Sequence, residues 1–192
     1  MNLKEQILRI LKVFMPALLA FAIGLAAISQ PVAADSEDRW DKLSTAFVLG
    51  LAGGAELQTL TQRDKAGQWE FFKTMAATLA LSQGLKAVIH KQRPDGSSND
   101  SFPSAHTALA FAAASYFDIR FGQKNQNVAP LLYSAAALTA FGRIKAKKHY
   151  FVDVAAGALL GAAMGHAFTS ANSGVNIYPT GDGAGINFAT KF

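Results

Sequence analysis

The chain has 192 residues, with 18 Lys and Arg, 13 Asp and Glu, and no Cys. This length suits one domain with its own core, and the lack of Cys excludes disulfides, thiolate metal sites and a lipid-modified N-terminal Cys. The net charge of +5 is modest and its basic residues bunch around two loops, so we expect a local anionic ligand and no nucleic-acid partner.

The N-terminus is typical of a targeting segment. Lys4, Arg9 and Lys12 precede an uncharged run over residues 13–34 that ends in Val-Ala-Ala before an acidic residue. This pattern predicts a signal peptide, residues 1–34, cleaved after Ala34. The alternative is a retained membrane anchor, because roughly 20 apolar residues are enough to span a bilayer. In either case we expect the domain that follows to be exported.

Residues 35–171 form the predicted functional domain. An acidic, amphipathic connector over 35–42 comes first. Ala and Leu then dominate several segments in which β-branched residues are sparse, and Gly or Pro stands near the proposed boundaries. The fold class is therefore all-α: a helical bundle of about five core helices after the N-terminal signal or anchor helix. The expected core helices lie near 43–60, 69–91, 104–119, 128–143 and 150–170.

The tail, residues 172–192, has a different pattern. Apolar residues alternate with others at Val175 and Ile177 and again at Ile186 and Phe188, on either side of a turn-forming segment. Such alternation predicts a short hairpin-like tail, a small surface ribbon beside the bundle.

A candidate anion site lies between two of the predicted helices. Lys86 and Arg93 are seven residues apart, so both leave the same helix face if the helix continues to Pro94. Ser104 is a good N-cap for the next helix, whose first backbone N–H groups would face the same anion. His90 and Lys91 lie between these positions and are expected to point elsewhere.

A second polar cluster follows about 40 residues later. His149 and Asp153 are related as i and i+4, which on a helix brings the carboxylate within reach of the imidazole. An Asp that accepts from one ring nitrogen fixes the tautomer and leaves the other nitrogen free as a nucleophile or base. Arg143 adds a planar, permanently charged group suited to phosphate oxygens.

These residues form a three-part pattern, and its parts have the right order and internal spacing. It consists of Lys86, six residues and Arg93-Pro94; Pro103-Ser104, one residue and His106; and Arg143, five residues, His149, three residues and Asp153. The pattern resembles the signature of the type 2 phosphatidic acid phosphatase and vanadium haloperoxidase superfamily. The resemblance spans residues 86–153 and implies hydrolysis of phosphomonoesters through a phosphohistidine.

The resemblance also implies a role for each residue. His149 would attack phosphorus, Asp153 would orient His149, and His106 would protonate the leaving oxygen. The phosphoryl oxygens would be held by Lys86, Arg93, Ser104, the Ala105 backbone amide and Arg143. No metal or other cofactor is expected, because these cations supply the charge and the four His show no metal-ligand spacing.

Two positions depart from the family pattern. Ala105 stands where the family usually has Gly, a mild change that keeps the backbone N–H. Gly142 stands where Ser usually precedes Arg143, so we expect the phosphate pocket to lack one hydroxyl donor.

Placement and substrate are left with alternatives. The family implied by the resemblance includes soluble exported phosphatases and six-span lipid phosphatases. The uncharged runs after the leader are short for membrane spans, so the main prediction is a soluble or loosely membrane-associated periplasmic enzyme. Its expected substrates are small phosphomonoesters, lipid phosphates or isoprenoid diphosphate. The alternative is an inner-membrane lipid phosphatase whose active site faces the periplasm. A vanadate-dependent haloperoxidase and a non-catalytic phosphate-binding protein are further alternatives, and the oligomeric state is left open.

Overall fold

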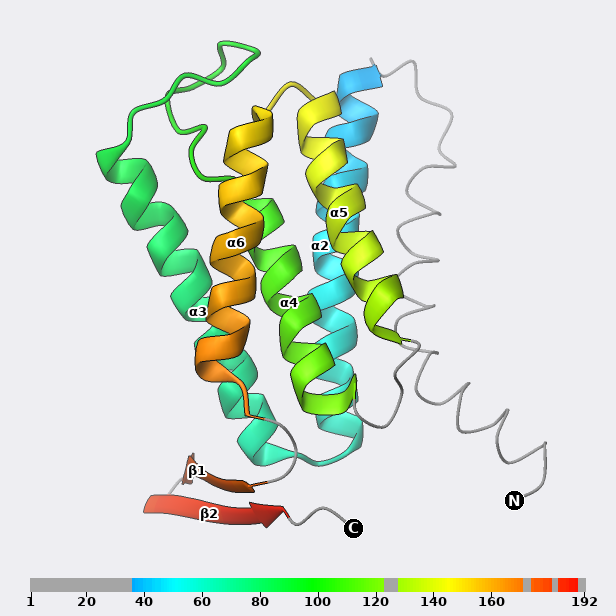
Figure 1. The fold of residues 1–192 in the computed structure, drawn as a ribbon, viewed down its shortest axis with the longest axis vertical. Helices are drawn as coiled ribbons and strands as arrows, with labels where there is room; N and C mark the ends of the chain where they lie inside the picture. Colours follow the sequence, from blue (N-terminus) through cyan, green and yellow to red (C-terminus); the bar gives the residue numbers. More distant parts are fainter. Residues whose placement is uncertain (1–35, 123–127, 171–173, 181–182, 190–192) are drawn as a thin grey trace, which may run out of the picture.

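The structure is a computed structural model that describes residues 36–122, 128–170, 174–180 and 183–189. Within these residues the chain forms five helices and one hairpin (Figure 1). The predicted all-α bundle is confirmed, whereas the predicted leader, 1–34, lies outside the described residues. The elements are α2 (Ser36–Thr61), α3 (Lys65–Val88), α4 (Ala105–Phe121), α5 (Val128–Lys145), α6 (Phe151–Phe168), β1 (Gly174–Thr180) and β2 (Gly183–Ala189).

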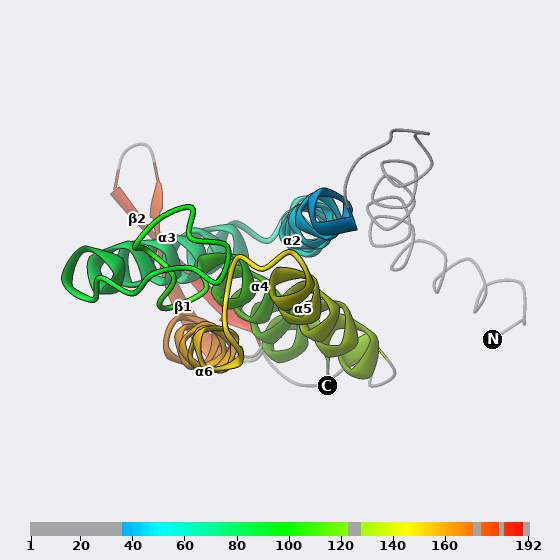
Figure 2. The same cartoon turned by 90° about the horizontal axis from the view of Figure 1, so that it is seen from above.

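Helix α4 lies at the centre of the bundle, and each of the other four helices contacts it (Figure 2). Its sequence explains this position, because its side chains are mostly small or apolar all round, as expected of a buried helix. Small Ala side chains let neighbouring helices come close, while aromatic residues fill the space towards its C-terminal end. Its buried apolar residues are Ala108, Ala110, Ala112, Ala113, Ala114, Tyr116, Phe117 and Phe121.

The contact between α4 and α6 depends on three glycines. Gly157, Gly161 and Gly165 recur every four residues on α6 and lie against α4. A Cβ at Gly161 would overlap the backbone carbonyl of Ala108, and one at Gly157 would meet the carbonyl of Ser104 at 2.5 Å. Backbone atoms cannot move aside as a flexible side chain can. The two helices therefore approach this closely only because α6 has no side chain at these positions.

Two predicted helix boundaries are wrong. Helix α2 begins at Ser36, so most of the expected connector over 35–42 belongs to its first two turns. Glu37 and Asp38 stabilise that start, because carboxylates interact favourably with the N-terminal end of a helix dipole. Helix α3 ends at Val88 and not near 91, since the next residues are extended and the carbonyl of Lys91 accepts from the backbone N–H of Ser101 at 2.9 Å.

A buried ion network closes the opposite end of the bundle. The Arg120 guanidinium donates to both oxygens of Asp64 at 2.7 Å and to Glu70 at 3.2 Å. The Ser170 hydroxyl in turn donates to Glu70 at 2.6 Å. These contacts join the start of α3, the end of α4 and the segment after α6. Strands β1 and β2 pair antiparallel beside this end (Figure 1), which confirms the hairpin-like tail.

The α4–α6 contact yields a prediction about stability. Gly161→Ala should lower the free energy of unfolding by about 1–3 kcal/mol, because the added methyl group forces the two helices apart. The matched control is Gly53→Ala in α2, where a Cβ would have no heavy atom within 4 Å. That change should be neutral or stabilise by up to about 1 kcal/mol, because Ala loses less backbone entropy than Gly in a helix. Thermal unfolding followed by circular dichroism measures both, and equal shifts in the two variants would contradict the packing argument.

Candidate active site

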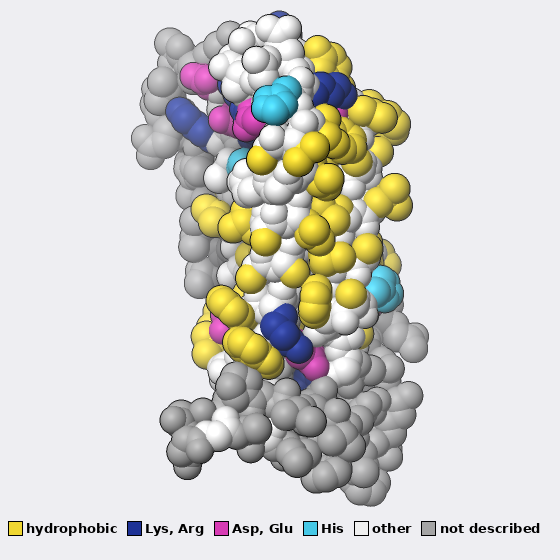
Figure 3. Space-filling model, turned by 90° about the vertical axis from the view of Figure 1, so that its left-hand side faces the viewer, with side chains coloured by type: hydrophobic (Ala, Val, Ile, Leu, Met, Phe, Trp, Pro, Cys, Tyr) yellow, Lys and Arg dark blue, Asp and Glu magenta, His cyan; other side chains and the backbone are white. Residues whose placement is uncertain are grey.

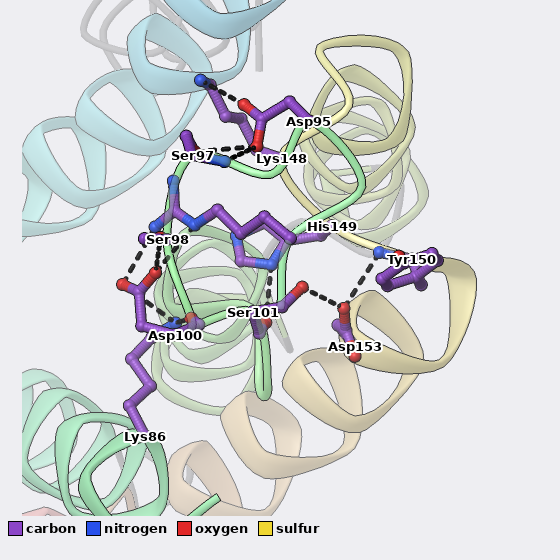
Figure 4. Close-up of polar contacts among 11 residues, drawn as sticks. Lys86, Asp95, Ser97, Ser98, Asp100, Ser101, Lys148, His149, Tyr150 and Asp153 are labelled. Carbon is purple, nitrogen blue, oxygen red and sulfur yellow. Dashed lines mark hydrogen bonds and ion pairs between the residues drawn. The ribbon is translucent and has the colours of Figure 1, made fainter. Parts of the chain in front are cut away.

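The predicted site residues lie at one end of the bundle. The loop over residues 89–104 and the turn over 146–150 meet there, above the N-terminal ends of α4 and α6 (Figures 1 and 4). Two contacts tie these segments together: the Asp95 backbone N–H donates to the Lys147 carbonyl at 3.1 Å, and Lys148 Nζ lies 2.7 Å from an Asp95 carboxylate oxygen. The residues at this end include Lys86, Arg93, Ser104, Ala105, His106, Arg143, His149 and Asp153.

His149 is buried, and one hydrogen bond fixes its tautomer. Its Nδ1 lies 2.7 Å from the backbone carbonyl oxygen of Ser101 (Figure 4). Because a carbonyl only accepts, Nδ1 must carry the proton, and in a neutral ring Nε2 then holds a free lone pair. Burial and, next, the charge of Arg143 lower the pKa of His149 to about 3, although the bond to Ser101 opposes this. The ring is therefore neutral near pH 7, with Nε2 available as a nucleophile.

The expected bond between His149 and Asp153 is wrong for this structure. Helix α6 begins at Phe151, so His149 precedes the helix and the i, i+4 geometry does not apply. Asp153 instead accepts from the Ser101 hydroxyl at 2.6 Å and from the Tyr150 backbone N–H at 2.9 Å (Figure 4). Ser101 thus contacts both residues, through its carbonyl to the imidazole and through its hydroxyl to the carboxylate.

Lys91 is also placed differently from the prediction. Its ammonium lies 2.5 Å from Asp153 Oδ1, whose side chain is fully buried. The prediction assumed a helix that continued past Lys91, and the end of α3 at Val88 removes that assumption.

His106 has its own partner on α2. Its Nε2 lies 3.2 Å from the Thr45 hydroxyl oxygen, and that hydroxyl donates its single hydrogen to the Asp41 carbonyl at 3.0 Å. The Thr45 oxygen must therefore accept from an Nε2–H group of His106. This tautomer places an N–H on Nε2. To act as a general acid the ring must also carry a proton on Nδ1, because a neutral imidazole that lost its one proton would become an imidazolate.

Lys86 and Arg93 converge on one carboxylate, although they do not share a helix face. Arg93 binds both oxygens of Asp100, at 2.8 and 3.0 Å, and Lys86 Nζ lies 3.9 Å from the same carboxylate (Figure 4). Burial raises the pKa of Asp100, but hydrogen bonds from Ser98 and Arg93 outweigh it and lower the pKa to about 2. An ionised carboxylate therefore lies between the two cations, where the resemblance expects phosphate.

Arg143 is buried and only partly satisfied. Its guanidinium contacts the Asp41 carboxylate and, at 3.5 Å, the Ser44 hydroxyl. Its Nε is buried without a hydrogen-bond partner among the described residues. A buried guanidinium N–H without an acceptor is costly, so the site favours an anionic ligand that reaches it.

The expectation for Gly142 is corrected by the packing of α5 on α2. A Cβ at Gly142 would lie 3.0 Å from the Ser44 Cβ and 3.3 Å from the Trp40 carbonyl oxygen. A side chain there would point at α2, so Gly142 provides room for α2. The hydroxyl beside Arg143 comes from Ser44.

Ser104 is the N-cap of α4, as predicted. Its side chain accepts from the Thr107 backbone N–H at 3.5 Å, and its own backbone N–H donates to the Asp153 carbonyl at 3.0 Å. Ala105 is the first residue of α4, where backbone N–H groups have no acceptor within the helix. The start of α4 can therefore supply donors to an anion beside His106.

Sequence reasoning missed several residues of the site. Those on α2 fall on one helix face, but their partners are 61–102 residues away in the chain, and no local pattern shows such a contact. Two of the missed residues could have been suspected from the sequence: Ser101, because it lies next to the Pro-Ser-Ala-His turn, and Lys91, because it is basic and close to Arg93. The missed residues are Asp41, Ser44, Thr45, Lys91, Asp100 and Ser101.

Comparisons with known proteins agree with this arrangement. A family model described as the PAP2 superfamily matches residues 67–176. A lipid A 1-phosphatase of Porphyromonas gingivalis is 38% identical over 94 residues, which are 47% of this chain and 21% of that protein. The match thus spans about a fifth of that relative's length. The crystal structure of Aquifex aeolicus LpxE is 28% identical, has a TM-score of 0.52, and covers 66% of this chain and 83% of its own.

The carboxylate between Lys86 and Arg93 yields a second prediction. Asp100→Asn should tighten inhibition by vanadate about tenfold, or roughly 1.4 kcal/mol, because the anion no longer displaces a bound carboxylate. Asp95→Asn is a matched control, since Asp95 pairs with Lys148 and lies outside this pair of cations. Vanadate binding is measured by calorimetry or by inhibition. Equal affinity in Asp100→Asn and the unaltered protein would show that Asp100 does not compete for this position.

Proposed function

The chain belongs to the PAP2 superfamily, whose model matches more than half of its residues, and we propose that it is a membrane phosphatase that hydrolyses phosphomonoesters of lipids. The observation that carries this proposal is the neutral His149, whose Nε2 is unprotonated and whose ring interacts with the charges of Arg143, Lys86 and Arg93. A neutral imidazole among cations suits attack on a phosphoryl group better than proton transfer alone.

The proposed reaction has two steps. In the first, a phosphate dianion bound beside His106 favours its imidazolium form, with a proton on both ring nitrogens. His149 Nε2 then forms a bond to phosphorus while the bond from phosphorus to the ester oxygen breaks, and His106 gives its Nε2 proton to that oxygen and becomes neutral. In the second, water attacks the phosphohistidine, the deprotonated His106 accepts a proton from this water, and phosphate leaves with His149 restored. The His149 tautomer already suits the first step, and the N–H of His106 is on the nitrogen that has to give up its proton.

The cations would stabilise the phosphoryl oxygens in both steps. Lys86 and Arg93 exchange Asp100 for phosphate, and Arg143 on α5 offers its Nε, which has no hydrogen-bond partner among the described residues. The start of α4, with Ser104 as its cap and the Ala105 amide in its first turn, adds neutral donors. Such preorganised donors gain strength where charge develops, because they need no reorganisation as the bond breaks. No metal is needed in this scheme.

The surface supports a lipid substrate and the membrane alternative. Large apolar side chains are exposed on several helices, among them Leu49 at 67%, Val88 at 77%, Phe151 at 76% and Leu159 at 74%. Figure 3 shows apolar side chains along the middle of one face and charged groups towards its two ends. An exposed apolar surface rimmed by charged groups is typical of a site that contacts a membrane or a partner protein. In the described residues, Phe151–Phe168 is the helix that is long and apolar enough to span a bilayer.

The comparisons favour the same alternative over a soluble periplasmic enzyme. The Porphyromonas gingivalis relative is by its name a phosphatase of lipid A, and 38% identity over the aligned part makes a lipid phosphate the substrate class we propose here. In this proposal residues 35–171 form the phosphatase domain, 1–34 precede it as a signal peptide or anchor, and 172–192 form the tail. The active site faces the periplasm.

The first test concerns the nucleophile. His149→Ala should reduce the hydrolysis of a lipid phosphate monoester at least about a thousandfold, since no other group replaces the attacking nitrogen. An acid-labile phosphoenzyme should be trapped with ³²P-labelled substrate in the unaltered protein and be absent from this variant. His166→Ala, an exposed position on α6, is the matched control and should keep full activity. Turnover that needs a divalent ion after EDTA treatment, or a fully active His149→Ala, would contradict the proposal.

The second test concerns placement. The chain has no Cys, so single cysteines can report which side of the membrane each end occupies. Lys145→Cys lies near the active site and Gln62→Cys in the turn between α2 and α3, and both positions are exposed. With a membrane-impermeant maleimide, Lys145→Cys should react in intact cells with a permeabilised outer membrane, and Gln62→Cys only after lysis. Recovery of the protein in the periplasmic fraction without detergent, or the reverse labelling, would exclude this placement.

A further inference from the structure

Lys91, in the loop after α3, contacts a buried carboxylate and two aromatic rings. Its ammonium is 2.5 Å from Asp153 Oδ1 and 4.6 Å from the centre of the Tyr150 ring, with the Phe102 ring at 5.9 Å. Its side chain is about one-third exposed, whereas that of Asp153 has no exposure at all. The ammonium thus lies between two aromatic rings and a buried carboxylate. These contacts restrict the flexible Lys91 side chain to one conformation.

The main chain of Lys91 holds the same part of the site. Its carbonyl accepts from the backbone N–H of Ser101 at 2.9 Å, and residues 91 and 100 pair as an isolated bridge. Lys91 therefore reaches Ser101 by two routes, directly through the backbone and indirectly through Asp153, which accepts from the Ser101 hydroxyl at 2.6 Å. The Ser101 carbonyl in turn holds Nδ1 of His149.

We propose that Lys91 is a positioning residue for the phosphatase reaction: it neutralises Asp153, which fixes Ser101, and the Ser101 carbonyl fixes the tautomer and orientation of His149. This inference rests on the proposed function. In this inference the hydrogen bond that orients His149 goes to the backbone carbonyl of Ser101. The Asp153 carboxylate acts on His149 only through Ser101. Lys91 lies outside the three-part pattern of the sequence.

Charge balance explains why the site needs Lys91. The groups that face His149 are Arg143 from α5, Lys86 from α3, Arg93 from the loop and, through Ser101, Asp153 from α6. A buried carboxylate without a cation is strongly unfavourable and draws protons or other cations towards it. With Lys91 removed, Asp153 keeps the Ser101 hydroxyl as a donor but loses its cation, and the imidazole of His149 is linked to it through Ser101. We therefore expect the pKa of His149 to rise from its present low value.

The test compares Lys91→Met with two controls. Lys91→Arg keeps the charge, and Lys145→Met removes the same charge from an exposed position on α5. For Lys91→Met we expect kcat to fall roughly 10–100-fold with KM changed less than about threefold, because the nucleophile and not the phosphate clamp is disturbed. Lys91→Arg should recover most of the loss, and Lys145→Met should match the unaltered protein.

A second measurement does not depend on turnover. In full-length protein labelled with ¹⁵N-histidine, the His149 signal is identified by its loss in His149→Ala, and its titration gives the pKa and the tautomer. In Lys91→Met the pKa should rise by roughly one to two pH units, with loss of the fixed Nδ1–H tautomer. The double variant Lys91→Met/Asp153→Asn removes both charges and should bring the pKa back towards its original value. If Lys91→Met does not fold, the double variant takes its place in the titration, because it removes both charges of the buried pair.

The outcomes separate this inference from the proposed function. Unchanged kcat and an unchanged His149 titration in Lys91→Met would overturn the inference while leaving the phosphatase intact. A pKa that stays raised in the double variant would also overturn it, because Lys91 would then act on His149 without Asp153. Absence of phosphatase activity in the unaltered protein would sink the proposed function, and the titration would still decide whether Lys91 positions His149.

Discussion

The active end of this protein depends on satisfying one fully buried carboxylate, that of Asp153. Because this side chain has no exposure, each of its oxygens needs a protein donor, and the three donors come from two segments: Lys91 and Ser101 of one loop and the backbone of Tyr150 before α6. The Asp153 carbonyl also accepts from the N–H of Ser104, at the cap of α4. Burial of one charge therefore orders the loop, both helix starts and, through Ser101, the proposed nucleophile.

A second feature of the site is that its cations are paired with carboxylates that a bound phosphate would replace. Asp100 lies between Lys86 and Arg93, and Asp41 lies against Arg143, so the cations have partners before any substrate binds. These carboxylates lower the free-energy cost of bringing three positive charges together, because their negative charges offset the repulsion between the cations. The partial exposure of both carboxylates, 44% and 40%, leaves them able to move aside for a phosphate. Helix α2, which supplies Asp41, lies outside the family match.

The bundle brings these groups together by close packing of small residues. Glycines on α6 lie against the backbone of α4, so the Asp153 carbonyl reaches the Ser104 amide at 3.0 Å. Gly142 likewise admits α2 to the side of Arg143, and Thr45 then reaches His106. The Arg120 network holds the far end of the same helices, so the ion pairs among the described residues lie at the two ends of the bundle. The apolar surface between them is what a lipid environment would cover.

The sequence by itself determined the helical bundle, the Ser104 cap and the three-part pattern, because each depends on residues close together in the chain. Periodicity, capping and fixed motif spacing are local properties. The tertiary structure alone decided that Ser101 and not Asp153 contacts His149, that Lys91 neutralises Asp153, and that α2 completes the site. These partners lie 48, 62 and 102 residues apart. A contact at that separation depends on where a helix ends and how closely two helices pack, as the end of α3 at Val88 and the absence of a side chain at Gly142 illustrate.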